Sequence, residues 1–304
     1  MSLLPLPPAT RALGSSSLQI SPMAWGMWRL VDGGHGVGDA ARLIHTTLDA
    51  GITLLDTADI YGFNGKSGFG DAETVLGEVL RAEPALRARM VLSTKGGIRP
   101  PLPYDQSAGW LAEAIDASLK RLGVEVIDLW HVHRPDILAH PQEVAAALDK
   151  AVQAGKIRTL GVSNFTVAQI AALNHFLDNK LAVTQPEISP LRLTCIENGE
   201  LDQAMVLGLR PLAWSPLGGG RLADPQSPRD KAVAGALDKV ALDKGVSRVV
   251  AAYSWLMAHP SGIVPIIGSQ NPLRIIEGAS AAAVQWSRQD WYDVLVAARG
   301  EPLP

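Results

Sequence analysis

The chain lacks most features of secreted, membrane and nucleic-acid-binding proteins. It has a single cysteine, Cys195, which excludes an internal disulfide and favours a reducing compartment. Its net charge of −3 provides no basic surface for nucleic acid or anionic lipid. No apolar run reaches the roughly 20 residues that span a bilayer, and residues 1–8 have no cationic start of a signal peptide. We therefore expect a cytoplasmic protein with no membrane partner.

What the sequence does contain is an ordinary core and a regular alternation of strand and helix patterns. Hydrophobic residues make up 47% and charged residues 19% of the chain, which suits a buried core. Eight apolar runs predict strands, at residues 23–28, 52–58, 90–95, 126–133, 159–163, 182–188, 211–215 and 263–268. Eight strand–helix units predict an α/β fold of the (β/α)8 TIM-barrel class. An open doubly wound sheet is the alternative, but no G-x-G-x-x-G follows the first strand.

Helical periodicity fills the segments between these strands. It occurs at residues 40–50, 72–80, 110–122, 143–154, 230–244, 248–259 and 289–298. Thr166 and Gln169 form a capping box, and Asn271 before Pro272 is typical of a helix start. No low-complexity linker interrupts the pattern. We therefore expect one barrel domain over residues 1–304, with a short N-terminal arm or hairpin around residues 15–17.

Ionisable side chains end three successive predicted strands. Asp56 ends the second, Lys95 the third and His133 the fourth, while Tyr61 follows Asp56 on the same loop. Catalytic groups of (β/α)8 barrels lie at the carboxyl ends of the strands. A carboxylate, a phenol, an ammonium and an imidazole should therefore meet in one corner of the barrel, where they would form an acid–base site.

The charges of these four groups predict their roles. A free tyrosine titrates near ~10, and the Lys95 ammonium should lower the pKa of Tyr61, making the phenol a usable proton donor. Asp56 would hold Lys95 in place and keep it charged, while His133 would donate a hydrogen bond that orients a substrate oxygen. Such a set can polarise and protonate a carbonyl, but it holds no electron pair for reduction. A cofactor must therefore supply hydride.

Each residue taken alone has a structural alternative. Asp56 could cap a strand end, Lys95 could be a solvated loop lysine and Tyr61 a loop anchor; their joint placement favours catalysis. His131 should share a face with His133 one layer deeper, and we expect it to be a packed, hydrogen-bonded interior residue. The same pair would suit a metal-dependent hydrolase, which needs further ligands. We expect no metal, because the other histidines fall in loops or helices: His35, His45, His140, His175 and His259.

Six motifs together resemble one enzyme family, the aldo-keto reductases. They are DTADIYG at 56–62, STK at 93–95, HRPD at 133–136, GVSNF at 161–165, WSPLG at 214–218 and IIGS at 266–269. The resemblance extends from Gly26 to about Glu277. It implies a (β/α)8 barrel that reduces small aldehydes or ketones with NAD(P)H, and it assigns the four roles above to the same residues. Some relatives are nucleotide-binding sensors or regulatory subunits, but the complete catalytic set argues against that alternative.

The resemblance also implies a nicotinamide site. Ser163, Asn164 and Gln185 would hold the carboxamide, which needs both donors and acceptors. Trp214 would stack on the nicotinamide ring.

A second segment at the first strand would lie beside the nicotinamide and the substrate, namely Gly26, Met27 and Trp28. Trp28 would form one wall of the substrate pocket. We expect Trp25 and Trp130 to pack outward, toward the helices.

The phosphates of the cofactor would lie along two further segments. The pyrophosphate would contact Ser215, Leu217, Gly219, Gly220 and Arg221, where glycines allow a close approach of backbone N–H groups. The adenosine end would contact Gly268, Ser269, Arg274 and Glu277. Arg274 in a first helical turn would clamp a 2′-phosphate, which favours NADPH over NADH. Gly268 and Gly278 stand where many relatives have lysine and asparagine, so fewer side chains would read that phosphate. The sequence does not imply an oligomer.

Overall fold

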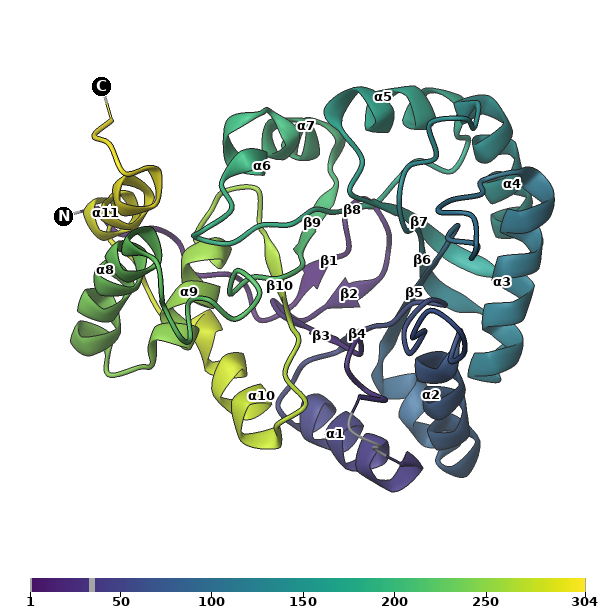
Figure 1. Ribbon diagram of the computed structural model, residues 1–304, viewed down its shortest axis with the longest axis horizontal. Helices are drawn as coiled ribbons and strands as arrows, with labels where there is room; N and C mark the ends of the chain where they lie inside the picture. Colours follow the sequence, from purple (N-terminus) through teal and green to yellow (C-terminus); the bar gives the residue numbers. More distant parts are fainter. Residues whose placement is uncertain (1, 33–35, 304) are drawn as a thin grey trace.

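The computed structural model describes residues 2–32 and 36–303, and a closed barrel forms its centre. Eight parallel strands pair in the order β10-β3-β4-β5-β6-β7-β8-β9, as Figure 1 shows. They are β3 (Ala24–Gly26), β4 (Leu54–Asp56), β5 (Val91–Gly96), β6 (Ile127–Val132), β7 (Ile157–Ser163), β8 (Val183–Gln185), β9 (Arg210–Ala213) and β10 (Val264–Ile267). The predicted (β/α)8 fold is confirmed.

Helices surround this barrel (Figure 1). They are α1 (Val37–Asp49), α2 (Asp71–Ala82), α3 (Ala108–Leu122), α4 (Pro141–Gln153), α5 (Val167–Phe176), α6 (Thr194–Glu197), α7 (Glu200–Leu207), α8 (Pro228–Lys244), α9 (Arg248–Met257), α10 (Pro272–Ala279) and α11 (Arg288–Arg299), with 3-10 turns η1 (Pro84–Arg89) and η2 (Ser280–Ala283). Within the described residues, none of these helices has the length and apolar composition needed to cross a membrane.

The sequence patterns predict where these elements lie more accurately than they predict where each element begins and ends. All eight predicted strands exist, but most are shorter than their apolar runs, and β7 begins at Ile157 rather than at residue 159. The helix starts at Thr166 and Asn271 are confirmed, since each side chain accepts a backbone N–H of the first turn. Helices α6 and α7 were not predicted. Asn198 and Gly199 separate them, and neither is long enough to show a clear period.

Two apolar shells hold the barrel together. An inner shell fills the barrel and includes Leu54, Leu129 and Leu212, while an outer shell joins the strands to the helices. Trp25 and Trp130 belong to the outer shell and are fully buried, as predicted. The core therefore fixes each strand on both faces, which also fixes the side chains at the strand ends.

A short hairpin lies at the amino ends of the barrel strands. It pairs β1 (Arg11–Ala12) with β2 (Gln19–Ile20) in antiparallel register, and its buried Leu13 belongs to the inner shell. Gly14 has a φ of +60°, and a Cβ there would lie 1.9 Å from the carbonyl oxygen of Ala182. Only glycine permits this close approach, so the hairpin packs directly against the barrel.

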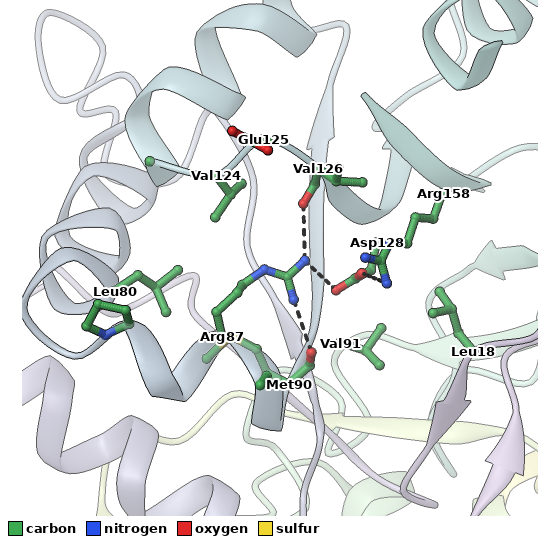
Figure 2. Close-up of a pocket in the computed structure, with 13 residues that line it drawn as sticks. Leu18, Leu80, Arg87, Met90, Val91, Val124, Glu125, Val126, Asp128 and Arg158 are labelled. Atoms are coloured by element: carbon green, nitrogen blue, oxygen red, sulfur yellow. Dashed lines mark hydrogen bonds and ion pairs between the residues drawn. The ribbon is translucent and has the colours of Figure 1, made fainter. Parts of the chain in front are cut away.

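A cavity of about 590 Å³ opens beside the same end of the barrel. Figure 2 shows Arg87 reaching across it to Asp128 and to two backbone carbonyl oxygens. Asp128 also accepts the backbone N–H of Leu92 at 2.8 Å and pairs with Arg158 at 3.3 Å. These groups satisfy one another, and the amino end of such a barrel serves stability rather than catalysis. We therefore place the candidate active site at the opposite end.

Candidate active site

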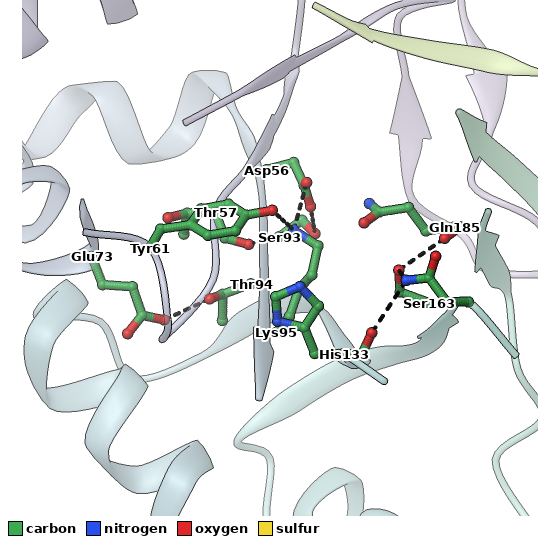
Figure 3. Close-up of polar contacts among 11 residues, drawn as sticks. Asp56, Thr57, Tyr61, Glu73, Ser93, Thr94, Lys95, His133, Ser163 and Gln185 are labelled. Atoms are coloured by element: carbon green, nitrogen blue, oxygen red, sulfur yellow. Dashed lines mark hydrogen bonds and ion pairs between the residues drawn. The ribbon is translucent and has the colours of Figure 1, made fainter. Parts of the chain in front are cut away.

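The side chains of Lys95, Asp56 and Tyr61 form one connected group at the carboxyl ends of β4 and β5. Lys95 Nζ donates to Asp56 Oδ2 at 2.7 Å, to the carbonyl oxygen of Thr57 at 2.7 Å and to Tyr61 Oη at 3.1 Å. Lys95 is completely buried and Asp56 nearly so. Asp56 Oδ1 accepts a further bond from Ser93 Oγ at 2.8 Å. Figure 3 shows the phenol and the ammonium pointing toward each other.

Backbone pairing places these groups before any side chain is considered. Asp56 lies beside Ser93 in the register of β4 and β5, which brings Asp56 and Lys95 within reach. The loop that carries Tyr61 is tied back to β5, because the N–H of Asp59 donates to the carbonyl oxygen of Lys95 at 3.0 Å. Gly62 completes the turn with a φ of +99°, and a Cβ there would lie 2.8 Å from Asp71 Cβ. Glycine after Tyr61 is thus a steric requirement of this loop.

His133 joins the group from the end of β6. Its backbone N–H donates to the carbonyl oxygen of Gly96 at 2.9 Å, and its ring lies 5.9 Å from the Tyr61 ring, edge to face. In the described part of the chain, neither ring nitrogen forms a hydrogen bond. Burial, reinforced by the charges of Lys95 and Arg134, holds the pKa of His133 well below its ordinary value. The imidazole is therefore neutral at neutral pH and has one N–H to donate.

The expected direction of the Tyr61 pKa shift was wrong. Burial of the hydroxyl raises the pKa of Tyr61 above its ordinary value, and Lys95 offsets that rise only in part. Burial also opposes the charge of Lys95, but Asp56 and Tyr61 outweigh it, so the pKa of Lys95 is raised. At neutral pH the site therefore holds a protonated phenol beside a charged ammonium. A protonated phenol is the form that a proton donor needs.

His131 lies one layer below this group and is fully buried, as predicted. Its ring interacts with the backbone of Val162, which raises its pKa, but among the described residues neither ring nitrogen has a hydrogen-bond partner of good geometry. Burial lowers the pKa of His131 to about 3. Gly161 makes room for the ring, because a Cβ there would lie 2.7 Å from His131 Nδ1. No three histidine, cysteine or acidic side chains of residues 2–32 and 36–303 converge as a metal site would require; His35 lies outside these residues.

A second cluster lies at the ends of β7, β8 and β9. Ser163 Oγ donates to the carbonyl oxygen of Gln185 at 2.8 Å and accepts from Asn164 Nδ2 at 2.7 Å. Asn164 Oδ1 accepts from Trp214 Nε1 at 2.9 Å. The side-chain nitrogen of Gln185 is buried and has no partner in the described residues. Figure 3 shows Ser163 and Gln185 beside the catalytic group.

The donors of this second cluster fit a carboxamide. An unpaired buried amide nitrogen costs free energy, and a carboxamide oxygen would satisfy Gln185. Asn164 has a φ of +60° and Ser215 a φ of +49°. Left-handed backbone is uncommon outside glycine and concentrates at functional sites. The part of the structure predicted to hold the nicotinamide thus contains both an unsatisfied polar group and strained backbone.

Comparison with known proteins agrees with this geometry. The model of the aldo/keto reductase family matches residues 22–295. The chain belongs to this family. It is an NAD(P)H-dependent oxidoreductase that reduces carbonyl groups.

Named relatives resemble this aldo/keto reductase over 95–100% of its length. It is 73% identical over 304 residues to the 6-dehydroglucose reductase of Novosphingobium aromaticivorans, with 100% of both chains covered. It is 36% identical to a 6-dehydroglucose reductase of Agrobacterium fabrum, over 95% of this chain and 98% of the relative. The crystal structure of a thermostable aldo-keto reductase with the inhibitor epalrestat matches with a TM-score of 0.81 at 21% identity, over 95% of this chain and 99% of that chain. That last match shows the shared fold.

The first-strand segment of this aldo/keto reductase divides between core and surface. The Met27 side chain is fully buried in the outer shell, so only its backbone could contact a cofactor. The Gly26 carbonyl oxygen accepts from Gln270 Nε2 at 3.2 Å. Trp28 is 60% exposed, with the Arg29 guanidinium 5.2 Å from its ring centre. A ring this exposed is free to form one wall of a substrate site.

The loop after β9 differs in one respect from the expected pyrophosphate site. Gly219 and Gly220 are exposed and have φ values of +70° and +96°, which side chains rarely adopt. Leu217 packs partly against the outer shell. The Arg221 guanidinium is paired through two nitrogens with Asp230 in the first turn of α8. Arg221 would have to leave that carboxylate to bind a phosphate.

The adenosine end of the predicted cofactor site lies on α10 and the loop before it. Arg274 is exposed and occupies the first turn of α10. Glu277 follows three residues later on the same helix, and both charges act electrostatically on the buried Tyr253. Ser269 Oγ accepts the backbone N–H of Asn271 at 3.2 Å. Gly268 is exposed with open space where a Cβ would be, so no side chain competes with Arg274 there.

Sequence reasoning missed two residues that the structure brings to the site. Ser93 bonds directly to Asp56, whereas the STK motif by itself indicates a role only for its lysine. Arg134 follows His133, and its guanidinium lies over the Trp214 ring at 5.6 Å from the ring centre. A single arginine after a histidine has no sequence signature, and Trp214 is distant along the chain.

Proposed function

We propose that this protein reduces the aldehyde of 6-dehydroglucose, a glucose oxidised to an aldehyde at carbon 6, and that it uses NADPH. The hydrogen bonds of Lys95 Nζ to both Asp56 and Tyr61 carry the catalytic part of this proposal. The 73% identity to a 6-dehydroglucose reductase over 304 residues supports the substrate. The product is glucose with a primary alcohol at carbon 6.

Tyr61 would donate the proton. Its O–H bond breaks as a new O–H bond forms on the substrate oxygen, and the phenolate that remains is stabilised by the Lys95 ammonium 3.1 Å away. Asp56 keeps Lys95 charged at that moment. Neutral His133 would donate its N–H to the same substrate oxygen and fix its direction. When bound, the dihydronicotinamide supplies the hydride that the carbonyl carbon accepts.

The cofactor would be held by three parts of this chain. Ser163, Asn164 and Gln185 fit the carboxamide, and the side-chain nitrogen of Gln185, which has no partner among residues 2–32 and 36–303, is available as a donor. The glycine-rich loop after β9 fits the pyrophosphate through its backbone. Arg274 at the start of α10 fits a 2′-phosphate, because the helix N-terminus and a guanidinium both favour an anion. This last feature supports NADPH over NADH.

The direct test is turnover. Purified protein should oxidise NADPH when 6-dehydroglucose is added, which is measured as a loss of NADPH absorbance. Glucose should accumulate in an amount equal to the NADPH consumed. If the protein reduces other aldehydes but not 6-dehydroglucose, the proposed substrate is wrong. Nucleotide binding without turnover across a broad aldehyde panel would favour the sensor alternative.

Arg274→Ala should weaken NADPH much more than NADH. A charge-assisted contact to phosphate contributes about 1.5–3 kcal/mol, so the dissociation constant for NADPH should rise roughly 10- to 100-fold while that for NADH changes little. Cofactor titration by fluorescence measures both. Arg288→Ala is the matched control, since Arg288 is also exposed in the first turn of a helix, α11. An equal loss for both nucleotides in Arg274→Ala would show that Arg274 does not read the phosphate.

A further inference from the structure

Arg134 is a half-buried cation at the active site, and no residue that the structure describes serves as its counter-ion. It directly follows His133, and in the described part of the chain its guanidinium forms no ion pair and no hydrogen bond. Other arginines on nearby loops are paired: Arg99 contacts Asp105 at 2.6 Å, and Arg221 contacts Asp230. An unpaired guanidinium that loses part of its water needs another acceptor.

The structure holds this guanidinium in place. It lies over the Trp214 ring at 5.6 Å from the ring centre, and Trp214 is itself fixed by its bond to Asn164 at 2.9 Å. The backbone is pinned from the other side, because Gln106 Nε2 donates to the carbonyl oxygen of Arg134. Stacking on an aromatic ring restricts the motion of the planar guanidinium but leaves the N–H groups along its edge free to donate. Arg134 is therefore preorganised to donate hydrogen bonds.

The same guanidinium lies close to the reacting groups, because Arg134 directly follows His133 and its guanidinium lies over Trp214 at the end of β9. Its charge lowers the pKa of both Tyr61 and His133, against burial in the first case and together with burial in the second. These two side chains mark where the carbonyl oxygen of a substrate would bind. Arg134 would thus face the part of the substrate that lies next to its carbonyl.

We propose that Arg134 binds hydroxyl groups of the sugar ring and thereby selects polyhydroxylated aldehydes over apolar ones. The inference rests on the proposed function, because it concerns the substrate of the same site. A guanidinium carries five N–H donors and no acceptor, and hydroxyl oxygens accept. An apolar aldehyde would leave those donors without partners, and sites built to bond a hydroxyl discriminate strongly against analogues that lack it.

The test compares Arg134→Met with wild type on two aldehydes of matched ring size. The first is 6-dehydroglucose and the second is cyclohexanecarbaldehyde, whose ring carries no hydroxyls. Methionine keeps an unbranched, flexible apolar side chain beside Trp214 but is shorter than arginine and has no donor. We expect kcat/KM for 6-dehydroglucose to fall roughly 10- to 100-fold, mainly through KM, with less than about a two-fold change for cyclohexanecarbaldehyde. Arg134→Lys should lose less activity than Arg134→Met, because an ammonium also donates hydrogen bonds but lacks the planar, two-pronged geometry of a guanidinium.

Two controls separate binding from support of the fold. Arg288→Met removes an arginine that also stacks on an aromatic ring, 5.9 Å from the ring centre of Tyr292, but far from the site; it should leave both substrates unaffected. The alkaline limit of activity should move to higher pH in Arg134→Met, because one of the cations that lower the pKa of Tyr61 is gone. That shift tests, independently of the aldehyde used, whether the guanidinium lies close enough to Tyr61 to act on it, and the contrast between the two ring aldehydes then tests hydroxyl binding.

Three results would overturn the inference. An equal loss of kcat/KM for both ring aldehydes would show that Arg134 only supports the geometry of the site. No loss for either aldehyde would show that Arg134 does not contact the substrate. A loss confined to an anionic aldehyde, succinic semialdehyde, would show that it binds a carboxylate instead. If wild type reduces cyclohexanecarbaldehyde but not 6-dehydroglucose, the proposed function fails. Glyceraldehyde and propanal, again matched except for hydroxyls, then decide the role of Arg134.

Discussion

Tyr61→Phe should lower kcat for aldehyde reduction by two to four orders of magnitude. General acid catalysis contributes roughly 10²- to 10⁴-fold, and phenylalanine removes the donor while keeping the ring. Cofactor binding should stay near normal, because Ser163 and Gln185 end β7 and β8 and Asn164 directly follows β7, away from the loop that carries Tyr61. Single-turnover kinetics with NADPH, together with a cofactor titration, measure the two effects separately. Tyr104→Phe, which removes the hydroxyl of a tyrosine 40% exposed to solvent, serves as the control.

The pH profile of wild type should agree with the same assignment. Reduction needs the protonated phenol, so activity is lost as pH rises through the pKa of Tyr61, which lies above its ordinary value of 10.0. The pKa of His133 lies well below 6.5, so its neutral form persists across the neutral range. The rate of the chemical step should therefore stay level from about pH 6 to 9 and fall only in more alkaline buffer. A fall in the reduction rate centred near pH 6.5, or unchanged turnover in Tyr61→Phe, would contradict these roles.

The barrel was predictable because its signals are local. Each strand is an apolar run bounded by turn residues, and the carboxyl ends of parallel strands must share one edge. Asp56, Lys95 and His133 could therefore be brought together without knowing a single contact. The short helices α6 and α7 were not predictable in this way, since Asn198 and Gly199 divide a segment too short to show its period.

Properties that depend on burial and on distant partners were harder to predict. The net pKa shift of Tyr61 sets burial and the Asp56 charge, which raise the pKa, against Lys95 and Arg134, which lower it. A sequence shows these charges but not the burial. His131 was correctly placed inside, but its hydrogen bonds depend on the exact surroundings of both ring nitrogens. Arg221 precedes Asp230 by one loop, whose conformation decides that the two pair. Such outcomes belong to tertiary structure.

Lys95→Met should cost both activity and stability, and a second substitution can separate the two. Lys95 is fully buried, so its loss leaves the Asp56 carboxylate without its cation in a site that is 2% exposed. Breaking a buried pair by removing one partner costs about 3–5 kcal/mol, which urea unfolding would measure. The matched surface pair is Lys156 with Asp116, exposed by 37% and 55%. Lys156→Met should cost less than about 1 kcal/mol.

Adding Asp56→Asn to Lys95→Met should restore much of the lost stability without restoring activity. The amide is uncharged and can still accept a hydrogen bond from Ser93, so the cost of burying an unpaired carboxylate is removed. The phenol of Tyr61 would remain without a neighbouring cation, so its phenolate would stay unstabilised and reduction slow. The double-mutant cycle gives the coupling between the two side chains directly. If the double variant is no more stable than Lys95→Met, the buried carboxylate is not what destabilises the single variant, and the Asp56–Lys95 pair is not the electrostatic unit that supports Tyr61.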